Sequence, residues 1–597
     1  MSYKSAASCG VVEWKPDNMG SINLPTTRWL ACSADEETQE LLARELGINP
    51  IVSQILTSRN ILNIDKAKKY LSPSLHDLHN PFLMKDIHEG VHRLIKAVYL
   101  GEKIAVYGDY DADGVTSVVA LLKFFHEIGL TADFYIPDRI NYGYGLHKHI
   151  IDEIKASGAA LIITVDCGIS DHEQVSYAGS VGLDVIIIDH HEISGSLPDA
   201  IAAINPHRSD CRFPFKHLAA VGVVFNFLIA LRGGLRREGF WANRRYPNLK
   251  SYLDLVALGT IGDISPLVDE NRIFAKVGLE LISDGVRTGV RALKEVCGLE
   301  HQAVDAGKTS YTLLPRINAA GRVASPDVAV QLLLTDNMDE ARQLARRLDD
   351  YNRRRQAMEK TIFQDIVKEI EQSGGPENRS SLVFASSEWH PGVVGIVASK
   401  LVDRFSRPVI LISLNNGIGK GSGRSIADFD LHRGLKECEP FLLAYGGHQY
   451  AAGISILEEN IEKFADVLDS VIREGADISE FVPRTLIDAQ CKLKDVNCDL
   501  LFQIRTLEPF GSGNPEPVIC ARNVNVASSE VVGNNHLRIK VHEDGVFCDS
   551  IWFRKGEFLN SLSGFLLDIA FTPKFNDWKR SGDIQLKMRD IAFPANV

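Results

Sequence analysis

Several common sequence features are absent from this chain. None of its ten cysteines forms a CxxC pair, which disfavours a zinc ribbon or a disulfide scaffold and fits a reducing compartment. No stretch reads GxxxxGK followed by Ser or Thr, so nothing supports a nucleotide-triphosphate motor. No apolar run is long enough to span a bilayer, and the N-terminal residues do not have a secretory pattern. We therefore expect a cytoplasmic protein.

A basic excess is also absent. Lys and Arg number 65 against 77 Asp and Glu, a formal net charge of -12, so the whole chain does not have the composition of a general nucleic-acid-binding protein. Hydrophobic residues make up 45% and charged residues 24% of the 597 positions, which excludes wholesale disorder and fibres. At roughly 100–200 residues per domain, this length predicts about three or four domains.

The alternation of strand and helix patterns divides the chain into five segments. Residues 1–75 read as a partly helical lead-in, and residues 76–325 alternate short β-rich runs with helices, which predicts an α/β domain built on a parallel sheet. Residues 326–376 read as a long connecting helix that is interrupted near Asp336 and Asn337, and residues 377–480 as a smaller α/β domain. Residues 481–597 contain short strands separated by turns, a pattern that predicts a small β-barrel.

Acidic residues and histidines follow the predicted strands of the first α/β domain, and one more acid follows an apolar helical stretch. These residues are Asp109, Asp111, Asp113, Asp166, Asp189, His190, His191 and Asp263. The carboxyl ends of parallel strands meet at the sheet edge where ligands bind, so we expect the side chains to converge. The carboxylates would repel one another strongly unless cations neutralised them. Oxygen ligands with one or two histidines suit Mn²⁺ or Mg²⁺, and two such ions about 4 Å apart would suit phosphoester hydrolysis.

Some of these residues also match other patterns. Asp109, Asp111, Asp113 and Gly114 also match the start of an EF-hand loop, but the twelfth position is Ala120 rather than Glu, and a strand precedes the loop. A single acid at a strand end is often a helix N-cap, and an isolated pair of histidines is often a core pair. The joint occurrence of these residues after several strands favours a metal site.

The motifs resemble those of a known family. GDYDADG, VDCG, IDHHE and TIGDISP are similar to the successive motifs of the DHH phosphoesterase superfamily, and GRSIADFDL with GGHQYAAG resembles its DHHA1 domain. The order of the motifs, PDRINYGYGLH, LLPRINAAGRV and a barrel segment carrying LEPFGSGNPEPV resemble the RecJ family of bacterial exonucleases, which are specific for single strands and act 5′→3′. The resemblance covers the chain from about Asp65 to its end.

The resemblance implies roles at the metal site. It implies two Mn²⁺ or Mg²⁺ ions per active site, with Asp166 as their bridge. The implied metal ligands are Asp109, Asp111, Asp113, Asp166, His190 and Asp263, with Asp109 either a ligand or a close partner of one. His191 would face the scissile phosphate, and the residues expected to act in catalysis are His191, Asp166 and Asp109.

The resemblance also implies substrate contacts. Arg139, Ser422 and Arg424 resemble the family's pocket for a 5′-terminal phosphate, and His448 would line the same cleft. Two further arginines could contact the strand backbone or simply pair with acids: Arg316 and Arg322. Tyr142 stands where the family pattern has an acidic residue, so the contacts of that loop are less defined.

The remaining nucleic-acid contacts are expected outside the two α/β domains. The basic run Arg353–Arg355 on the connecting helix predicts contact with DNA or a neighbouring domain, although such runs are most often solvated. The barrel resembles an OB-fold, which would guide single-stranded DNA by stacking and backbone attraction. About half of its candidate aromatics should instead lie in the barrel core. The candidates are Phe547, Trp552, Phe553, Phe575 and Trp578.

The resemblance implies a metal-dependent 5′→3′ exonuclease that degrades single-stranded DNA to 5′-mononucleotides by two-metal hydrolysis, in DNA recombination and repair. The partners it implies are single-strand-binding protein and a helicase. Two alternatives belong to other classes: a phosphodiesterase for small substrates such as oligoribonucleotides or cyclic dinucleotides, and a catalytically silent replication scaffold. The barrel and the lead-in argue against the first alternative, and the complete ligand set argues against the second.

Overall fold

The structure is a computed structural model that divides the chain into two compact units. It describes residues 10–14, 27–33, 35–139, 142–193, 195–373, 375, 379–475, 481–559, 562, 564–576 and 583–594. One unit comprises Ser74–Glu474 with Gly511–Asn514, and the other comprises the described residues of Met1–Pro73, Gly475–Phe510 and Pro515–Val597. None of the helices within the described ranges combines the length and apolar character needed to cross a membrane.

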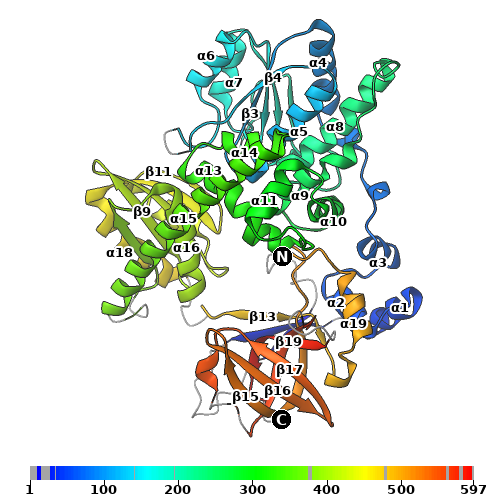
Figure 1. The fold of residues 1–597 in the computed structure, drawn as a ribbon. Helices are drawn as coiled ribbons and strands as arrows, with labels where there is room; N and C mark the ends of the chain where they lie inside the picture. Colours follow the sequence, from blue (N-terminus) through cyan, green and yellow to red (C-terminus); the bar gives the residue numbers. More distant parts are fainter. Residues whose placement is uncertain are drawn as a thin grey trace. The chain divides into compact units, whose positions relative to one another are not determined.

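The larger unit begins with a fully parallel five-stranded sheet, as the sequence predicts. Its strand order is β4-β3-β5-β6-β7. The strands are β3 (Ile104–Gly108), β4 (Ala132–Tyr135), β5 (Leu161–Val165), β6 (Asp184–Ile188) and β7 (Ala202–Ile204). Helices cover both faces of this sheet (Figure 1). They are α4 (Ile87–Leu100), α5 (Ala112–Glu127) and α8 (Ala220–Arg237) on one face, and α6 (Lys148–Ala156) and α7 (His172–Ser180) on the other.

The strands are apolar on both faces because both faces are covered. In β3, Ile104 and Val106 pack into the cluster with α4, α5 and α8, whereas Ala105 and Tyr107 pack into the cluster with α6 and α7. This alternation follows from the two-residue period of a strand. The sheet is therefore a rigid interior layer whose carboxyl edge can hold side chains in fixed positions.

A helical region connects this sheet to the next domain. Its first helices are α9 (Leu253–Gly262), α10 (Asp269–Asp284), α11 (Thr288–Val296), α12 (Ala306–Lys308), a π-helical turn η5 (Thr309–Leu313) and α13 (Leu314–Val323). The predicted long helix, with a break near Asp336, is confirmed as α14 (Asp327–Leu334) and α15 (Met338–Gln372). Asn337 caps α15 by accepting the amides of Asp339 and Glu340, so the break is a new helix start.

A second five-stranded sheet, in the order β11-β12-β10-β9-β8, completes the larger unit. Its strands are β8 (Leu382–Ser386), β9 (Val409–Asn415), β10 (Ile418–Arg424), β11 (Leu442–Gly447) and β12 (Ala451–Leu457). Its helices are α16 (Pro391–Phe405), α17 (Leu431–Glu437) and α18 (Ile461–Gly475). Helix α15 packs against α16 through apolar residues such as Ile362 and Val394, so the connecting helix is part of this domain's core.

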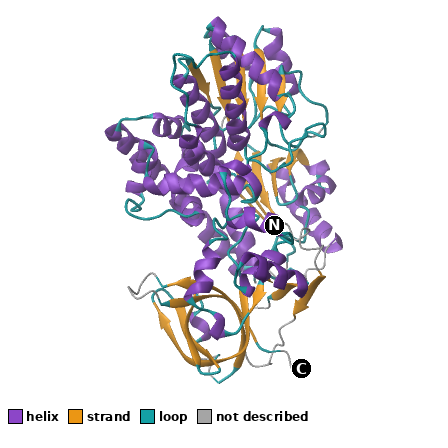
Figure 2. Cartoon of the chain, turned by 90° about the vertical axis from the view of Figure 1, so that its right-hand side faces the viewer, coloured by secondary structure: helices purple, strands orange, loops and turns teal. Residues whose placement is uncertain are grey.

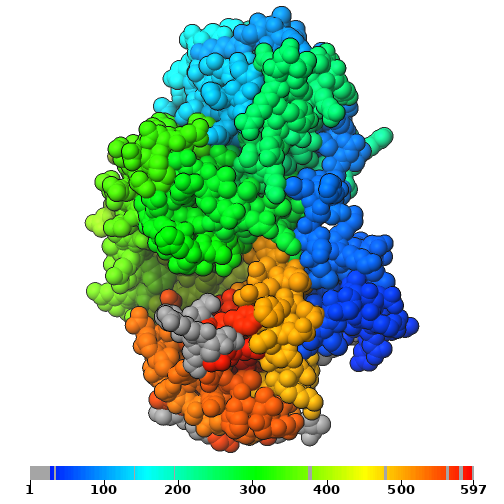
Figure 3. Space-filling view, turned by 45° about the vertical axis from the view of Figure 1, so that its right-hand side comes forward, coloured from blue at the N-terminus to red at the C-terminus, as the bar shows by residue number. Residues whose placement is uncertain are grey.

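The smaller unit contains a closed barrel and a helical subdomain. Strands β15 (Ile519–Val532), β16 (His536–Glu543), β17 (Val546–Trp552), β19 (Ile584–Ala592) and β18 (Leu566–Phe575) form a ring that β15 and β18 close (Figure 2). The short strand β14 (Ala489–Gln490) pairs with β15 and extends the barrel sheet. A separate three-stranded sheet is formed by β1 (Gly10–Trp14), β2 (Arg28–Ser33) and β13 (Arg484–Ile487). The helices are α1 (Glu36–Leu46), α2 (Pro50–Ser58), α3 (Ile64–Leu71) and α19 (Cys498–Arg505), with α2 against α19 (Figure 3).

Candidate metal centre

Three neighbouring strands end in polar residues at the same level of the parallel sheet. Val165 at the end of β5 pairs with Gly108 of β3 on one side and with Ile188 of β6 on the other. The residues that follow these strands are Asp109, Asp166 and Asp189. The expected convergence at the carboxyl edge is thus what the strand register produces. Asp166 has φ +62°, a left-handed conformation that turns the chain out of the sheet and that Asp tolerates better than most residues.

The two acids that follow Asp109 are held by helix N-termini. Asp111 caps α5, because one of its carboxylate oxygens accepts the amides of Asp113 and Gly114. Asp113 is buried, and its two oxygens accept the amides of Ala220 and Val221 at the start of α8, at 2.7 and 2.9 Å. Each carboxylate oxygen has a second lone pair, so these bonds orient Asp113 without preventing it from binding a cation.

All six predicted ligands fall into groups of three whose ligand atoms lie within 4.8 Å of one another. The groups are Asp109, Asp111 and Asp166; Asp113, His190 and Asp263; and Asp166, His190 and His191. His190 of the second group also approaches the first group, because its Nε2 lies 3.2 Å from Asp166 while its Nδ1 lies 3.9 Å from Asp263. The first two groups define two adjoining subsites of three ligands each. The first subsite is Asp109, Asp111 and Asp166, the second is Asp113, His190 and Asp263, and Asp166 faces both.

Two buried atoms of the cluster have no hydrogen-bond partner. They are Oδ1 of Asp109 and Nε2 of His190. Nε2 of His190 is close to Asp166, but the two do not have the geometry of a hydrogen bond. An unpaired buried polar atom is costly, by about 1–3 kcal/mol. An unpaired carboxylate oxygen and an unpaired imidazole nitrogen among these acids fit divalent cations of the Mn²⁺ or Mg²⁺ type.

The electrostatics of the cluster agree with that fit. Burial raises the pKa of Asp109 and of Asp166 well above the usual carboxyl range, and the neighbouring carboxylates raise both further. Burial also raises the pKa of Asp263. Although burial opposes it, Asp263 and Asp113 raise the pKa of His190. The acids are therefore held close together at an electrostatic cost that a bound cation would relieve.

His191 is oriented by Asp189, a residue to which sequence reasoning gave no role of its own. Asp189 is completely buried and accepts Nδ1 of His191 at 2.7 Å, together with the backbone amides of His190 and Ile169. Although burial opposes the shift, the bond to His191 lowers the pKa of Asp189 to about 2. Burial acts to lower the pKa of His191, but the hydrogen bond and the charge of Asp189 raise it to about 9. The proton on Nδ1 faces Asp189, so Nε2 of His191 is directed away from it.

Tyr144 is a second contact of His191 that the sequence did not single out. Its hydroxyl donates to the backbone carbonyl of Asp166 at 3.0 Å and lies 3.1 Å from Nδ1 of His191. It belongs to the GYG segment of the loop after β4, and only its position in that motif pointed towards it. Tyr144 therefore ties this loop to the turn that carries Asp166.

Three of the predicted phosphate-binding residues share one electropositive region. Arg424 at the end of β10 donates to Ser422 Oγ at 3.0 Å, and a Cβ added at Gly395 would lie 2.7 Å from that hydroxyl. Burial lowers the pKa of Arg424, and Arg139 lowers it further. Burial and then the charges of Arg139 and Arg355 lower the pKa of Arg322 to about 10. Several guanidinium groups are thus held near one another, an arrangement that favours an anion.

The region of these arginines adjoins the first subsite. The guanidinium carbon of Arg139 lies 4.9 Å from the ring of Tyr110, the residue between Asp109 and Asp111. Arg322 donates to the carbonyl of Gly392 at the start of α16, so it also links the two α/β domains. These positions are compatible with the predicted phosphate pocket.

The two remaining predicted substrate contacts, Arg316 and His448, already have partners of their own within the protein. Arg316 uses Nε and Nη2 on Asp349 and Nη1 on the carbonyl of Thr312, so a contact with DNA would require that ion pair to break. His448 is exposed in the turn between β11 and β12, and its backbone amide donates to Ala451, the partner of Arg424 in the sheet.

The basic run on α15 and the loop residue Tyr142 also have observed partners. Arg353 pairs with Asp349 on its own helix at 2.8 Å. Arg355 and Lys400 both pair with the buried carboxylate of Glu359, which joins α15 to α16. Tyr142 is 51% exposed and lies 4.4 Å from the ring of His149.

The barrel aromatics divide between core and surface, as expected. Trp552 is buried, whereas Phe547 and Phe553 are 56% and 47% exposed. Phe575 is half-buried, with Arg505 4.7 Å from its ring, and Trp578 lies outside the described residues. The exposed rings lie beside side chains of β16: Nζ of Lys540 is 5.4 Å from the ring of Phe547, and the ring of His536 is 5.0 Å from that of Phe553.

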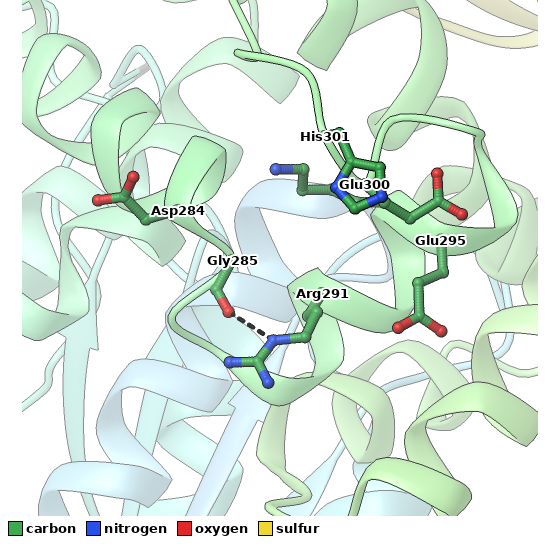
Figure 4. Close-up of a pocket in the computed structure, with 7 residues that line it drawn as sticks. Asp284, Gly285, Arg291, Glu295, Glu300 and His301 are labelled. Atoms are coloured by element: carbon green, nitrogen blue, oxygen red, sulfur yellow. Dashed lines mark hydrogen bonds between the residues drawn. The ribbon is translucent and has the colours of Figure 1, made fainter.

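Two concave sites of the larger unit are separate from the carboxylate cluster. One, of about 470 Å³, lies at the end of α10 and along α11 (Figure 4), where Arg291 donates to the carbonyl of Gly285. Three acids line it together with Arg291, Lys294 and His301, and its Glu295 is already paired with Arg342. The other, of about 1060 Å³, lies between α15 and the β9–β10 turn. Neither contains a residue of the metal cluster.

Comparison with known proteins assigns this arrangement to a family. The model of the DHH family, N-terminal domain, matches residues 103–260; the DHHA1 domain matches residues 378–474; and the RecJ OB domain matches residues 487–590. The chain is similar to the structure of RecJ from Thermus thermophilus in complex with Mn²⁺, with a TM-score of 0.81, 27% identity, and coverage of 95% of this chain and 80% of that one. The same enzyme in complex with Mg²⁺ gives a TM-score of 0.75 at 26% identity, covering 95% and 79%.

Curated relatives give the same family over almost the whole chain. The single-stranded-DNA-specific exonuclease RecJ of Bacillus subtilis (strain 168) is 36% identical over 570 residues, 95% of this chain and 71% of the relative. The protein of the same name from Escherichia coli (strain K12) is 34% identical over 571 residues, 93% and 97% of the two chains. With its DHH, DHHA1 and OB domains in that order, this chain belongs to the RecJ family of DHH phosphoesterases.

Proposed function

We propose that this chain is a metal-dependent exonuclease that hydrolyses single-stranded DNA in the 5′→3′ direction and releases 5′-mononucleotides. The observation that carries the proposal is the cluster of five carboxylates and two histidines at the carboxyl edge of the parallel sheet, with arginines beside it. Family membership supports the substrate, because the curated relatives are named single-stranded-DNA-specific exonucleases. The role that follows is in DNA recombination and repair.

Two Mn²⁺ or Mg²⁺ ions would be held by the two subsites of the cluster. Their ligands would be Asp109, Asp111, Asp113, Asp166, His190 and Asp263, with Asp166 between the two ions. When bound, such ions polarise a phosphodiester and lower the pKa of a water molecule. The unpaired atoms of Asp109 and His190 support this assignment.

His191 would bind the scissile phosphate and would not serve only as a metal ligand. Its Nδ1 proton is directed to Asp189, so its Nε2 is the ring atom available to a substrate. The cationic form is favoured because Asp189 raises the pKa of His191 to about 9, against the opposing effect of burial. A protonated Nε2 would donate to a phosphate oxygen as negative charge develops there.

Arg139, Ser422 and Arg424 would bind a 5′-terminal phosphate. The guanidinium groups offer paired donors, and the absence of a side chain at Gly395 leaves room for the Ser422 hydroxyl and the Arg424 guanidinium, which would lie 2.7 and 3.2 Å from a Cβ there. Arg322 adds positive charge to the same region, His448 would extend it from the β11–β12 turn, and Arg316 would reach the strand only by leaving Asp349. A single strand whose end is fixed in this way places its first phosphodiester over the cluster.

The barrel would bind the single strand outside the active site. Strands β16 and β17 correspond to the second and third strands of an OB-fold, the face on which such domains bind nucleic acids. Exposed Phe547 on β17 and Phe553 directly after β17 lie beside Lys540 and His536 of β16, a combination that suits stacked bases and a phosphate backbone. Single-strand-binding protein and a helicase as partners, and a cytoplasmic location, are part of the same proposal and rest on the family.

The function is tested with short DNA strands labelled at one end. The purified chain is incubated with Mn²⁺ or Mg²⁺ and with single-stranded DNA labelled at its 5′ or its 3′ end. The expected result is early release of labelled mononucleotide from the 5′ end, with the 3′ label remaining on a shortening ladder, and no reaction after chelation. A blunt duplex of the same sequence serves as the control for strand specificity.

The same assay separates the alternative functions. Hydrolysis of dinucleotides or cyclic dinucleotides without degradation of longer DNA would indicate a phosphodiesterase for small substrates. No metal-dependent hydrolysis of any of these substrates would indicate a silent scaffold. Either result would refute the exonuclease proposal.

A further inference from the structure

Helix α9 ends in a turn with an unexpected residue in it. The amide of Ser265 donates to Thr260 and the amide of Ile264 donates to Ile261, the two bonds of a Schellman motif. In this motif the residue at the Ile264 position takes a left-handed conformation, and Ile264 has φ +61°. Glycine usually occupies that position, because a β-branched side chain there is strained by roughly 1–2 kcal/mol.

Several other helices of the described part of the chain follow the usual preference. Helices α1, α4 and α10 end with left-handed Gly47, Gly101 and Gly285. Among the residues that the structure describes, Ile264 is the one β-branched side chain with a positive φ. Strained positions that persist are concentrated at functional sites.

Packing within the protein does not compensate for this strain. The Ile264 side chain is 71% exposed. The hydrophobic contact that often accompanies a Schellman motif involves the residue after it, which here is Ser265, and Ser265 donates instead to the carboxylate of Asp263 at 2.5 Å. An exposed apolar side chain on a strained backbone stabilises nothing in the free protein.

The position of Ile264 relative to the cluster indicates what it could contact. It follows Asp263, which belongs with Asp113 and His190 to the second subsite, and consecutive Cα atoms lie only about 3.8 Å apart. The arginine region adjoins the other subsite, next to Tyr110. A strand with its 5′ end at the arginines would cross the first subsite and then reach the side of Asp263.

We propose that Ile264 is a substrate-binding residue that packs against the base of the second nucleotide, on the 3′ side of the scissile phosphodiester. The inference rests on the proposed exonuclease function and adds a base contact to it. Covering an exposed apolar side chain with the face of a base favours binding regardless of sequence, because every base has an apolar face. The contact would hold the scissile phosphate over the cluster while the first nucleotide leaves.

The test compares the wild type with Ile264→Gly, which removes the side chain and relieves the strain. We expect an unchanged or higher melting temperature, and a rise of about 5- to 10-fold in KM for 5′-phosphorylated single-stranded DNA, the loss of about one apolar contact. The Kd for the same oligonucleotide, measured by fluorescence anisotropy without divalent ions, should rise similarly. Ile264→Leu keeps an apolar contact and should stay within about twofold of wild type.

Abasic oligonucleotides identify the contact. With an abasic residue at the second position, Ile264→Gly and wild type should have the same KM, whereas an abasic residue at the first position should leave their difference intact. Ser406→Gly, a left-handed position (φ +50°) ending α16, is the control; it should change stability but not KM.

Two results would overturn the inference. One is an Ile264→Gly protein with unchanged KM and Kd on intact DNA, and the other is a difference that persists with the abasic second nucleotide. Both leave the exonuclease proposal standing, because that proposal fails only if the wild type itself does not release 5′-mononucleotides.

Discussion

Individual side chains in the cluster are held in place by hydrogen bonds to the protein itself, in addition to any contact with a metal or a substrate. Asp113 is fixed by the amides of α8, Asp111 by those of α5, and His191 by Asp189. These partners reduce the conformational freedom of each group before a metal or substrate arrives, which is how a site remains precise. The consequences can be tested one residue at a time.

Asp166→Asn removes one charge at the point shared by the two subsites. Asn has nearly the same shape and tolerates the left-handed backbone of this position, so the fold should be kept. We expect Mn²⁺ affinity and the rate of DNA hydrolysis each to fall by about 100-fold or more. Isothermal titration with Mn²⁺ and the labelled-DNA assay measure the two effects. Asp199→Asn, at an exposed position, is the matched control, and full activity of Asp166→Asn would refute the metal assignment.

Asp189→Asn tests how His191 is oriented. The amide would present a donor where Asp189 now accepts three backbone amides and Nδ1 of His191. We expect kcat to fall between about 10²- and 10⁴-fold, as when the carboxylate partner of a catalytic histidine is replaced. Tyr144→Phe removes only a hydroxyl that lies near the same nitrogen, so its loss should be much smaller. Equal losses in the two variants would contradict the orienting role of Asp189.

At the scale of elements, the approach of α5 to the end of β3 shapes the cluster. A Cβ at Gly114 would lie 2.3 Å from the carbonyl oxygen of Asp109, so the GDYDADG turn closes only with glycine there. The turn places Asp109 and Asp111 on one subsite while α5 carries Asp113 to the other. The spacing of the motif is therefore a packing requirement as well as a chemical one.

Gly114→Ala should separate the strand end from the helix start. Overpacking against backbone costs about 1–3 kcal/mol, and the displaced Asp109 should weaken Mn²⁺ binding as well as thermal stability. Gly179→Ala in α7 is the control, since no atom lies within 4 Å of a Cβ there and Ala should stabilise the helix by up to about 1 kcal/mol. A Gly114→Ala protein with unchanged melting temperature and Mn²⁺ affinity would contradict the close approach.

In the barrel, Glu516 joins the start of β15 to two other strands. It pairs with Lys574 of β18 at 2.6 Å and with Arg589 and Lys587 of β19. Burial acts to raise the pKa of Glu516, but its bond to Lys574 and the surrounding positive charges lower it below the usual value of 4.5. A carboxyl whose pKa is lowered in the folded state stabilises the fold above its unfolded pKa.

This stabilisation should therefore be lost at acidic pH. It is fully present above the unfolded pKa of Glu516 and disappears as the pH falls through the lower folded value. Glu516→Gln should lower the melting temperature near neutral pH, and the difference from wild type should shrink between about pH 5 and about pH 3. Thermal denaturation followed by circular dichroism measures this. Glu557→Gln, at an exposed barrel position, should not show the trend; a constant difference for Glu516→Gln would contradict it.

For the whole molecule, the net charge of -12 and the proposed DNA contacts are compatible because they occur at different places. Part of the negative excess is the carboxylate cluster, which bound cations would offset. The positive groups proposed to bind DNA are a few placed arginines and the exposed face of β16 and β17. Phosphate recognition should then depend on those residues and on metal, with little general attraction to DNA.

Salt dependence of binding tests this distribution of charge. We expect the logarithm of the affinity for 5′-phosphorylated single-stranded DNA to fall with the logarithm of salt at a slope of about -2 to -3, because roughly three or four phosphates are neutralised. Blunt duplex should bind weakly throughout. Arg424→Ala should reduce the slope by about 0.7–1, whereas Arg353→Ala, on the exposed side of α15, should not. A much steeper slope for the wild type would indicate a broad basic surface instead.

The parallel sheet, the break after α14 and the convergence of acids could be predicted because they depend on local patterns. Apolar runs and helical spacing define the strands and helices, and parallel strands bring their carboxyl ends to one edge. The pairing of Arg316 with Asp349, the orienting bond from Asp189 and the contact of Tyr144 could not be predicted. The contacts of Arg316 and Tyr144 join residues from separate elements, and for Asp189 the spacing along the chain does not record which of several neighbours its carboxylate will choose.

The amino-acid sequence by itself determined the parallel sheet, the family and which residues gather at the sheet edge, because periodicity and motif order are local properties of the chain. Only the tertiary structure decided how those residues divide into two subsites and which polar atoms remain unpaired. These features depend on distances of a few ångströms between distant segments, and packing sets such distances. The missing basic excess likewise did not exclude DNA, since the position of a few charges matters more than their sum.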